Sequence, residues 1–435
     1  MAAATAAGLG RDFRKLWAAN SVSTLGDGMV AAAAPLLVAS ISDDPVLIGL
    51  AVFVQQLPWL LFSLFSGAVI DRIDKRRLIV AVDVLRGLLV AAFALSVWLG
   101  HVSIPLIYGM AFALGTGETL AGNAASTLVP AVVDPDHLPT ANARLHGSYF
   151  VLNRFAGQPI GATLFVLAAA LPFGLDALSF LFSALLVATM SGVRGAGAVP
   201  DGGTDARTDP GSTSGAPTRS IRAEIGEGLR WVWHDPVVRM MSAALCVMNI
   251  ALSAGFSIMV LYARDQLGLG DVGYGFLLSA SAVGGALGVL VTPRLQSWFR
   301  ASVLLRAGLV IETLTHVGLA LSTTAWAAAG VLVAFGVHSS VLGGVETTQR
   351  QRRVPEELRG RVQSVFMMLG VGGHVFGALL GGPLVRWQGV SAPFWCSAVA
   401  MTLVTVVSWR PFGRNLPTGK AGTPETAAGE AYSLP

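Results

Sequence analysis

The chain has 435 residues, of which 53% are hydrophobic and only 12% charged, and its formal net charge is +4 at pH 7. Soluble domains carry about 25% charged residues, so this composition excludes a water-soluble globular protein and makes the lipid bilayer the solvent for most of the chain. The basic residues form short clusters between apolar runs, which is typical of cytoplasmic loops and argues against a nucleic-acid-binding face. Cys246 and Cys396 both lie inside apolar runs and indicate no disulfide framework.

Residues 1–15 form a basic segment, predicted to be cytoplasmic, that contains Arg11, Arg14 and Lys15. The apolar run that follows continues to about residue 40. A cleavable signal peptide would end at a small-residue cleavage site, and this run has none. We therefore expect the run to be retained as the first transmembrane span.

Twelve apolar runs are long enough to cross a membrane, for which about 20 mostly apolar residues are needed. They predict an all-α integral membrane protein with twelve transmembrane helices. The first six runs lie near residues 16–40, 46–69, 78–99, 103–126, 142–169 and 172–190. The other six lie near residues 238–262, 272–292, 303–321, 325–347, 362–384 and 391–409.

Lysine and arginine crowd every second connection between these runs, which is the pattern that the positive-inside rule requires of an even-numbered bundle. The pattern predicts a multi-pass protein of the cell membrane with both termini in the cytoplasm. The basic connections are the N-terminus, residues 70–77, 191–239, 294–306 and 350–361, and the C-terminal tail.

A Gly/Pro/Ser/Asp-rich stretch at 191–221 has no core-forming residues and is predicted to be a flexible cytoplasmic linker. It separates an N-terminal six-helix bundle at 16–190 from a second unit at 222–410. That second unit opens with an amphipathic stretch at 222–236, predicted to lie at the membrane interface, and continues as a C-terminal six-helix bundle. Residues 411–435 are predicted to be a disordered cytoplasmic tail.

The two bundles share sequence features at equivalent places. VDPDHL (133–138) precedes the fifth run, and RVPEEL (353–358) precedes the eleventh. GQPIGATL (157–164) then matches GHVFGALL (373–380). These matches predict a duplicated six-helix unit, with the two copies related by an axis along the membrane normal.

A pseudo-symmetric six-plus-six bundle with a long central loop resembles the major facilitator superfamily. The connection between the second and third runs is similar to that family's G-x-x-x-D-R-x-G-R-R-R signature, with Asp74 in the place of the second glycine. The resemblance implies a conformational latch, in which an acidic residue pairs with the opposite half when the cytoplasmic side closes. The alternative is that these charges only set topology. The signature residues are Gly67, Asp71, Arg72, Lys75, Arg76 and Arg77.

Three further stretches, at 21–38, 128–143 and 227–241, resemble the exporter branch that includes macrolide-efflux and enterobactin (siderophore) exporters. GQPIG in the fifth run is similar to the exporters' G-P-x-x-G signature. The resemblance implies that Gly157, Pro159 and Gly161 form a helix bend or a tight helix interface. Close helix packing without any part in transport is the alternative.

Ionisable residues inside spans are costly and therefore mark candidate functional sites. The candidates for proton coupling or for lining a cavity are Asp27, Glu118, Arg154 and Glu312. The resemblance implies that the first, fourth and fifth helices line a central cavity, so we predict that Asp27 and Glu118 exchange protons. Arg154 is predicted to be a charge partner or a substrate contact. A static buried ion network is the alternative.

Helical spacing also places two pairs of ionisable residues on common faces. Asp83 and Arg86 are three residues apart in the third run, so they can pair with each other, and Glu312 and His316 are four apart in the ninth. His338 and other ionisable residues are scattered near helix ends or among glycines.

No phosphate-binding loop, Cys/His metal spacing or nucleophile elbow occurs in the chain, so we expect no cofactor, no metal and no catalytic residue. Transport energy is then expected from an ion gradient. The resemblance to the exporters implies proton-coupled efflux of an amphipathic small molecule, such as a drug, antibiotic or siderophore, by alternating access, and it implies a monomer. The alternatives are a metabolite facilitator or importer on the same fold, and a lipid scramblase or membrane enzyme.

Overall fold

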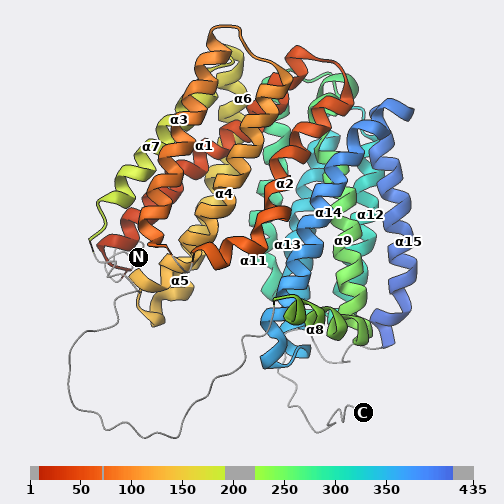
Figure 1. The fold of residues 1–435 in the computed structure, drawn as a ribbon. Helices are drawn as coiled ribbons and strands as arrows, with labels where there is room; N and C mark the ends of the chain where they lie inside the picture. The colour runs from red at the N-terminus through yellow and green to blue at the C-terminus, as the bar shows by residue number, and fades with distance from the viewer. Residues whose placement is uncertain (1–8, 71–72, 192–220, 415–435) are drawn as a thin grey trace, which may run out of the picture. The chain divides into compact units, whose positions relative to one another are not determined.

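The computed structural model describes residues 9–70, 73–191 and 221–414, and every element within those ranges is a helix. This confirms the predicted all-α class. The chain divides into two compact units, Met1–Gly228 (unit 1) and Leu229–Pro435 (unit 2). Each unit is a bundle of long helices (Figure 1).

Unit 1 is built around its first helix, α1, which packs against α7, the π-helical segment η3 and α6. α3 packs against α7 and α4, and α4 also packs against α2. The 3₁₀ turn η2, Pro135–His137, precedes α5. The helices are α1 (Arg11–Ile41), α2 (Pro45–Ile70), α3 (Lys75–Trp98), α4 (Ile104–Val132), α5 (Leu138–Ser148), η3 (Tyr149–Gly157), α6 (Gln158–Leu167) and α7 (Leu171–Ala188).

Unit 2 repeats these pairings with helices from the second half of the chain. α9 packs against α14, α11 against α13, and α12 against α15 and α13. α8 (Ile221–His234) contains the boundary between the two units and leads directly into α9. The other helices are α9 (Pro236–Phe256), α10 (Met259–Leu261), η4 (Tyr262–Gln266), α11 (Asp271–Trp298), α12 (Ala301–Leu321), α13 (Ala325–Arg353), η5 (Glu356–Leu358), α14 (Arg359–Gln388) and α15 (Ala392–Arg414).

Matching glycines make equivalent close helix crossings in the two units. In unit 1 a Cβ added to Gly161 of α6 would lie 2.5 Å from the Met29 Cα of α1. In unit 2 a Cβ added to Gly377 of α14 would lie 2.9 Å from the Ile250 Cα of α9. Gly161 and Gly377 are the equivalent positions of the two matched stretches in the sequence. The duplication therefore extends to the backbone contacts that small residues permit in a membrane.

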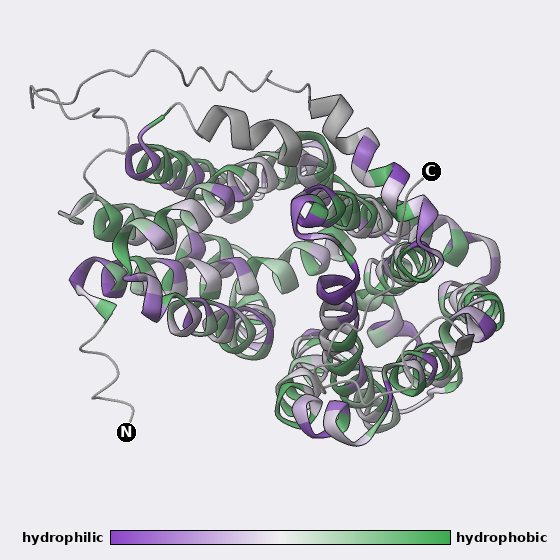
Figure 2. Cartoon of the chain, turned by 90° about the horizontal axis from the view of Figure 1, so that it is seen from below, coloured by the Kyte–Doolittle hydropathy of each residue, from purple (hydrophilic) through white to green (hydrophobic). Residues whose placement is uncertain are grey.

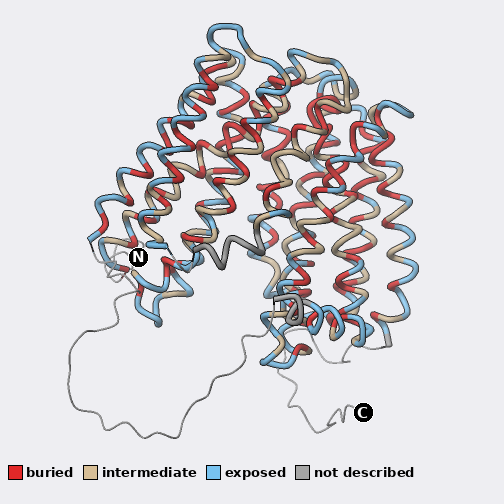
Figure 3. The backbone as a smooth tube through the Cα atoms, in the orientation of Figure 1, coloured by how far each residue is buried: buried red, intermediate tan, exposed pale blue. Residues whose placement is uncertain are grey.

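Eleven of the described helical segments are long and apolar enough to cross a membrane. α4 has 29 residues but is not among them, because Glu118 and several glycines and threonines lower its apolar content. Hydrophobic residues recur along the helices (Figure 2), and buried and exposed positions alternate along individual helices (Figure 3). Large apolar side chains such as Leu178, Leu290 and Val406 are exposed. Such surfaces require lipid around them, so the chain is a multi-pass membrane protein.

The fifth span is not one uniform α-helix. α5, η3 and α6 run continuously, and the nine residues of η3 form π-helical turns. π-Helical turns are rare and are frequently found at functional sites. Arg154 lies within η3, so an irregular backbone segment carries one of the predicted site residues.

Candidate functional site

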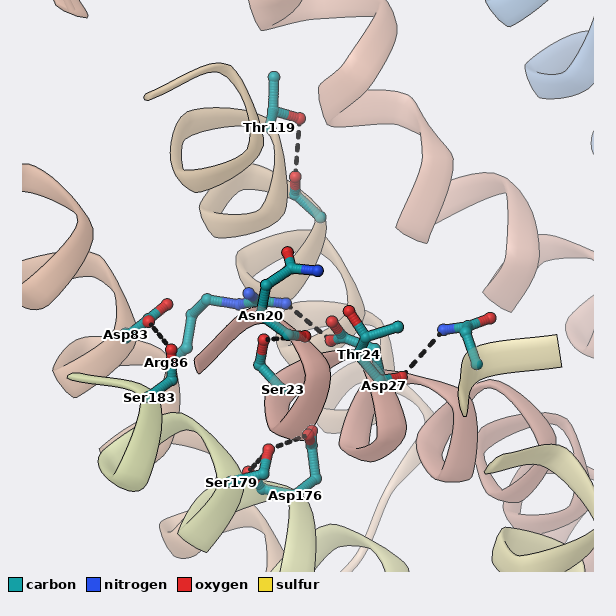
Figure 4. A network of polar contacts seen from close by, with 12 residues as sticks. Asn20, Ser23, Thr24, Asp27, Asp83, Arg86, Thr119, Asp176, Ser179 and Ser183 are labelled. Carbon is teal, nitrogen blue, oxygen red and sulfur yellow. Dashed lines mark hydrogen bonds and ion pairs between the residues drawn. The ribbon is translucent and has the colours of Figure 1, made fainter. Parts of the chain in front are cut away.

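An ion pair between α1 and α3 lies at the centre of unit 1 (Figure 4). Arg86 Nη2 donates a hydrogen bond to Asp27 Oδ1 at 2.9 Å. The Arg86 side chain is 6% exposed and the Asp27 side chain 29% exposed. Arg86 therefore pairs with a carboxylate of another helix and not with Asp83 of its own. Asp83 Oδ2 instead accepts a hydrogen bond from Ser183 Oγ of α7 at 2.7 Å.

The Arg86 side chain is held on two further sides. Its guanidinium carbon lies 3.9 Å from the centre of the Phe180 ring of α7, which is a cation–π contact. On the α4 side, a Cβ added to Gly117 would lie 2.7 Å from Arg86 Cδ. The absence of a side chain at Gly117 thus lets the arginine lie against α4, next to Glu118.

Asp176 of α7 is a buried carboxylate of the same region that the sequence analysis missed. It is 0% exposed, and its Oδ1 accepts a hydrogen bond from Ser179 Oγ at 3.2 Å. Its Oδ2 is buried and has no hydrogen-bond partner among the described residues. α1 approaches it at Gly26, where an added Cβ would collide with the carboxylate. An aspartate near the start of the apolar run 172–190 was the signal that could have found it.

Glu118 and Arg154 occupy different surroundings from Asp27. Glu118 of α4 is half-buried, and its side chain is hydrogen-bonded to that of Trp59 of α2. Arg154 is exposed, and its guanidinium carbon lies 6.0 Å from the centre of the Tyr149 ring. Arg154 is also near enough to Glu118 to interact with it electrostatically. The predicted trio is therefore spread over three helices, and the cation in contact with Asp27 is Arg86.

The charges of this network do not balance. Four carboxylates act electrostatically on the Arg86 guanidinium: Asp27, Glu118, Asp176 and Asp83. Arg86 is paired with Asp27, and Arg154 acts on Glu118, so the two buried acids, Asp83 and Asp176, have no cation of their own. A buried charge without a partner is strongly unfavourable. The remaining acids must therefore be neutral or be reached by water. An arrangement of this kind can take up and release protons when its access to water changes.

The fifth-span signature lies beside this network. A Cβ added to Gly157 would lie 2.9 Å from the Gly28 Cα of α1, one residue from Asp27. Pro159 stands in the first turn of α6, and Gly161 makes the crossing with Met29 described above. These positions bring α6 against the stretch of α1 that carries Asp27.

The structure describes only part of the predicted latch signature at residues 67–77. Gly67 belongs to α2, whereas Asp71 and Arg72 lie outside the described residues. Asp74, which replaces the second signature glycine, caps α3 by accepting a hydrogen bond from the Arg77 backbone N–H at 2.9 Å. An aspartate is among the preferred residues for this position.

The remaining basic residues, Lys75, Arg76 and Arg77, form the first turn of α3. Arg76 Nε donates to Val187 O at 3.1 Å, and Arg76 Nη2 donates to Ala188 O. Arg76 therefore caps the carboxyl end of α7 within unit 1, where unpaired carbonyls need donors.

Glu312 of α12 lies in unit 2 and contacts two histidines. Its Oε2 is 2.6 Å from His338 Nε2 of α13, and its Oε1 is 3.4 Å from His316 Nε2. Across the described part of the chain, no group of three or more His, Cys, Asp or Glu side chains is arranged to hold a metal ion.

Comparisons with known proteins agree with the fold. The MFS_3 family model, described as "Transmembrane secretion effector", matches residues 4–424. The chain is 26% identical to the multidrug efflux pump Tap of Mycolicibacterium fortuitum, over 88% of this chain and 91% of Tap. It is 24% identical to the enterobactin exporter EntS of Shigella boydii serotype 4, over 85% of this chain and 84% of EntS.

Solved structures share the fold at low sequence identity. The nucleoside transporter NupG superimposes with a TM-score of 0.70 at 10% identity, covering 93% of this chain and 99% of NupG. A bacterial homologue of the iron transporter ferroportin gives a TM-score of 0.69 at 17% identity, covering 93% of this chain and 99% of that protein. The predicted resemblance is confirmed: the chain is a membrane transporter that belongs to the transmembrane secretion effector family of the major facilitator superfamily.

Proposed function

We propose that the protein exports an amphipathic small molecule, such as a drug, antibiotic or siderophore, in exchange for protons. The observation that carries the proposal is the excess of carboxylates around Arg86 in unit 1, two of which, Asp83 and Asp176, are buried. The efflux pump and the siderophore exporter among its relatives support the outward direction. We place the protein in the cell membrane, acting as a monomer with both termini in the cytoplasm.

The proposed proton step begins with Asp27 ionised and paired with Arg86. A proton that binds to Asp27 neutralises it and releases the guanidinium, which can then pair with Asp176 or Glu118. When the proton leaves, the original pair forms again. Each access state therefore has its own charge pairing, and a proton is exchanged as one state converts into the other.

Access alternates, in this proposal, by movement of the two six-helix units relative to each other, as in other transporters built from repeats. Substrate and proton occupy unit 1 in different halves of the cycle, which gives antiport. The membrane potential supplies about 2.3 kcal/mol per charge per 100 mV. Glu118 is the second proton carrier, Arg154 is a substrate contact or charge partner, and Asp71 acts as the latch.

Inside-out vesicles energised by respiration provide the test. Ethidium, a macrolide and a siderophore are offered in turn, and substrate uptake and proton release are measured together. We expect uptake that requires the proton gradient and stops when a protonophore is added. Asp27→Asn should abolish gradient-driven uptake, whereas Asp43→Asn, a control at an exposed residue between α1 and α2, should leave it unchanged.

The same experiment separates the other functions. Uptake that follows only the substrate gradient, and that a protonophore does not affect, would identify a facilitator. Movement of a labelled lipid between leaflets without solute uptake would identify a scramblase. Full gradient-driven transport by Asp27→Asn would refute the role of that carboxylate.

A further inference from the structure

Glu312 is completely buried in unit 2 and sits between two imidazoles. Its side chain is 0% exposed, and those of His316 and His338 are 2% and 4% exposed. His316 lies one turn further along α12, and His338 projects from α13. His338 Nε2 is hydrogen-bonded to one carboxylate oxygen, whereas His316 Nε2 lies 3.4 Å from the other oxygen without a hydrogen bond. The Phe335 ring packs edge-on against His338, with 5.7 Å between the ring centres, and closes the apolar side of the site.

The histidines are the only titratable groups acting on Glu312 among the described residues. His316 comes from its own helix and His338 from α13. The other packed elements, α15 and α11, contribute no charged group to it in the described part of the chain. A polar contact from α15 joins Thr405 to Thr313, the neighbour of Glu312 in the chain, at 3.4 Å between hydroxyl oxygens.

Charge balance then requires a proton at this cluster. With both imidazoles neutral, the carboxylate would be a buried anion without a counter-ion, which is strongly unfavourable. One added proton makes the cluster neutral overall, either as imidazolium with carboxylate or as imidazole with carboxylic acid. The 2.6 Å separation of His338 Nε2 from Glu312 Oε2 is the distance of a charge-assisted hydrogen bond in which that proton lies.

The same distance argues against a metal ion in the position of the proton. Two ligands that each lie about 2.0–2.2 Å from a tetrahedral zinc ion stand further apart than 2.6 Å. Nδ1 of each imidazole is buried and has no hydrogen-bond partner among the described residues. Each ring therefore has a nitrogen that water could reach if the cluster opened, and this gives the proton a route out.

We propose that Glu312, His316 and His338 form a proton-binding site of unit 2, separate from the network around Arg86. The site holds one proton between the Glu312 carboxylate and an imidazole while it is closed. When it opens, the proton passes to water and the carboxylate is left hydrated. The contribution of this site to transport rests on the proposed proton antiport, whereas its protonation does not.

The protonation is tested by nitrogen NMR of the full-length protein, labelled with ¹⁵N-histidine and reconstituted in lipid nanodiscs. At pH about 8 a water-exposed histidine is neutral, so an imidazolium signal at that pH reports a paired ring. We expect this signal in the wild type and its loss in Glu312→Gln. Glu346→Gln is the matched control, because Glu346 is also buried in unit 2 but contacts neither histidine, and it should keep the signal. If Glu312→Gln does not fold, His338→Asn replaces it.

Three outcomes overturn the proposal in different ways. Neutral imidazoles in the wild type at pH about 8, together with a ¹³C signal of an ionised Glu312 carboxylate, would show that no proton is held. Loss or broadening of the two histidine signals on addition of Zn²⁺ or Co²⁺ would show a metal site. We expect vesicles carrying Glu312→Gln to release one proton fewer per substrate molecule than wild-type vesicles. If the wild type shows the imidazolium signal but the two kinds of vesicle release the same number of protons per substrate molecule, the cluster has only a structural role. If transport does not depend on protons but the imidazolium signal is present and depends on Glu312, the proposed function is refuted and the proton-binding site is supported.

Discussion

Arg86 of α3 and Asp27 of α1 are 59 residues apart in the sequence and form a 2.9 Å ion pair inside unit 1. Replacing Arg86 with alanine would leave the buried carboxylates without their cation. Removal of one partner from a buried pair costs about 3–5 kcal/mol, so we expect a lower free energy of unfolding and no transport. Thermal unfolding of the purified protein measures this effect.

The matched control for that substitution is Arg264→Ala. Arg264 also pairs with an aspartate, Asp265, but both side chains are more than two-fifths exposed. Exposed pairs contribute about 0–1 kcal/mol, so the melting temperature should hardly change. Equal melting temperatures for the two variants would show that the Arg86 pair is not structurally important.

Asp176→Asn tests the surplus of acids in unit 1. The amide has the shape of the carboxylate and can still accept from Ser179, so the variant should fold with an unchanged melting temperature. It cannot carry a proton, so fewer protons should be released for each substrate molecule taken up by vesicles. Asp136→Asn, at an exposed residue of η2, is the control. Identical proton-to-substrate ratios would exclude Asp176 from coupling.

Gly161→Ala tests the crossing between α6 and α1. The new Cβ would lie 2.5 Å from Met29 Cα, so the helices must separate, at a cost of about 1–3 kcal/mol for overpacking. Gly174→Ala of α7 meets no atom within 4 Å and should be neutral or slightly stabilising. Gly161→Ala should therefore melt at a lower temperature than Gly174→Ala, and equal melting temperatures would contradict the close crossing of α6 and α1.

Arg76→Ala tests the cap on α7. The substitution removes two hydrogen bonds to the last carbonyls of the helix, each with a net contribution of about 0.5–1.5 kcal/mol. We expect a loss of about 1–2 kcal/mol of stability, measured by thermal unfolding. Arg77→Ala, at the neighbouring exposed side chain, should have no such effect. If both variants unfold at the wild-type temperature, the contacts of Arg76 do not stabilise α7.

Asp71→Asn separates the latch from a topology signal. A latch residue stabilises one access state, so its loss should slow turnover and leave the substrate affinity largely unchanged. Substrate uptake rates over a range of concentrations measure both quantities. If Asp71→Asn takes up substrate at the wild-type rate, the charges of this loop only set the topology.

The fold was predictable because hydropathy, basic loops and the repeated GQPIG and GHVFG stretches all report on large-scale features of the chain. Asp27 was also identifiable, because a lone acid in an apolar run is costly wherever it lies. Its partner was not, since spacing within one helix suggested Asp83 for Arg86, and pairing across helices depends on how α1, α3 and α7 pack. Three-residue spacing permits a contact but does not select it over a better one.

The same limit applied to His338 and Asp74. His338 is 26 residues from Glu312 and belongs to another helix, so no local pattern joins them. Asp74 was read as a departure from a glycine signature, although its side chain can cap the helix that starts at the next residue. Sequence patterns place residues on faces, whereas contacts between helices decide which faces meet.

The π-helical turns at 149–157 give the fifth span room to change its length. The backbone hydrogen bonds of a π turn join residues five apart, whereas those of an α turn join residues four apart. A π turn therefore contains one residue more than an α turn. Deletion of one residue there can be absorbed as a return to α geometry, with both ends of the span left in place. The same deletion in α3 between Arg77 and Arg86 would turn every later side chain by about 100° relative to the start of the helix and separate Arg86 from Asp27. We expect the first deletion variant to be expressed as a folded monodisperse protein and the second to aggregate, as size-exclusion chromatography would show.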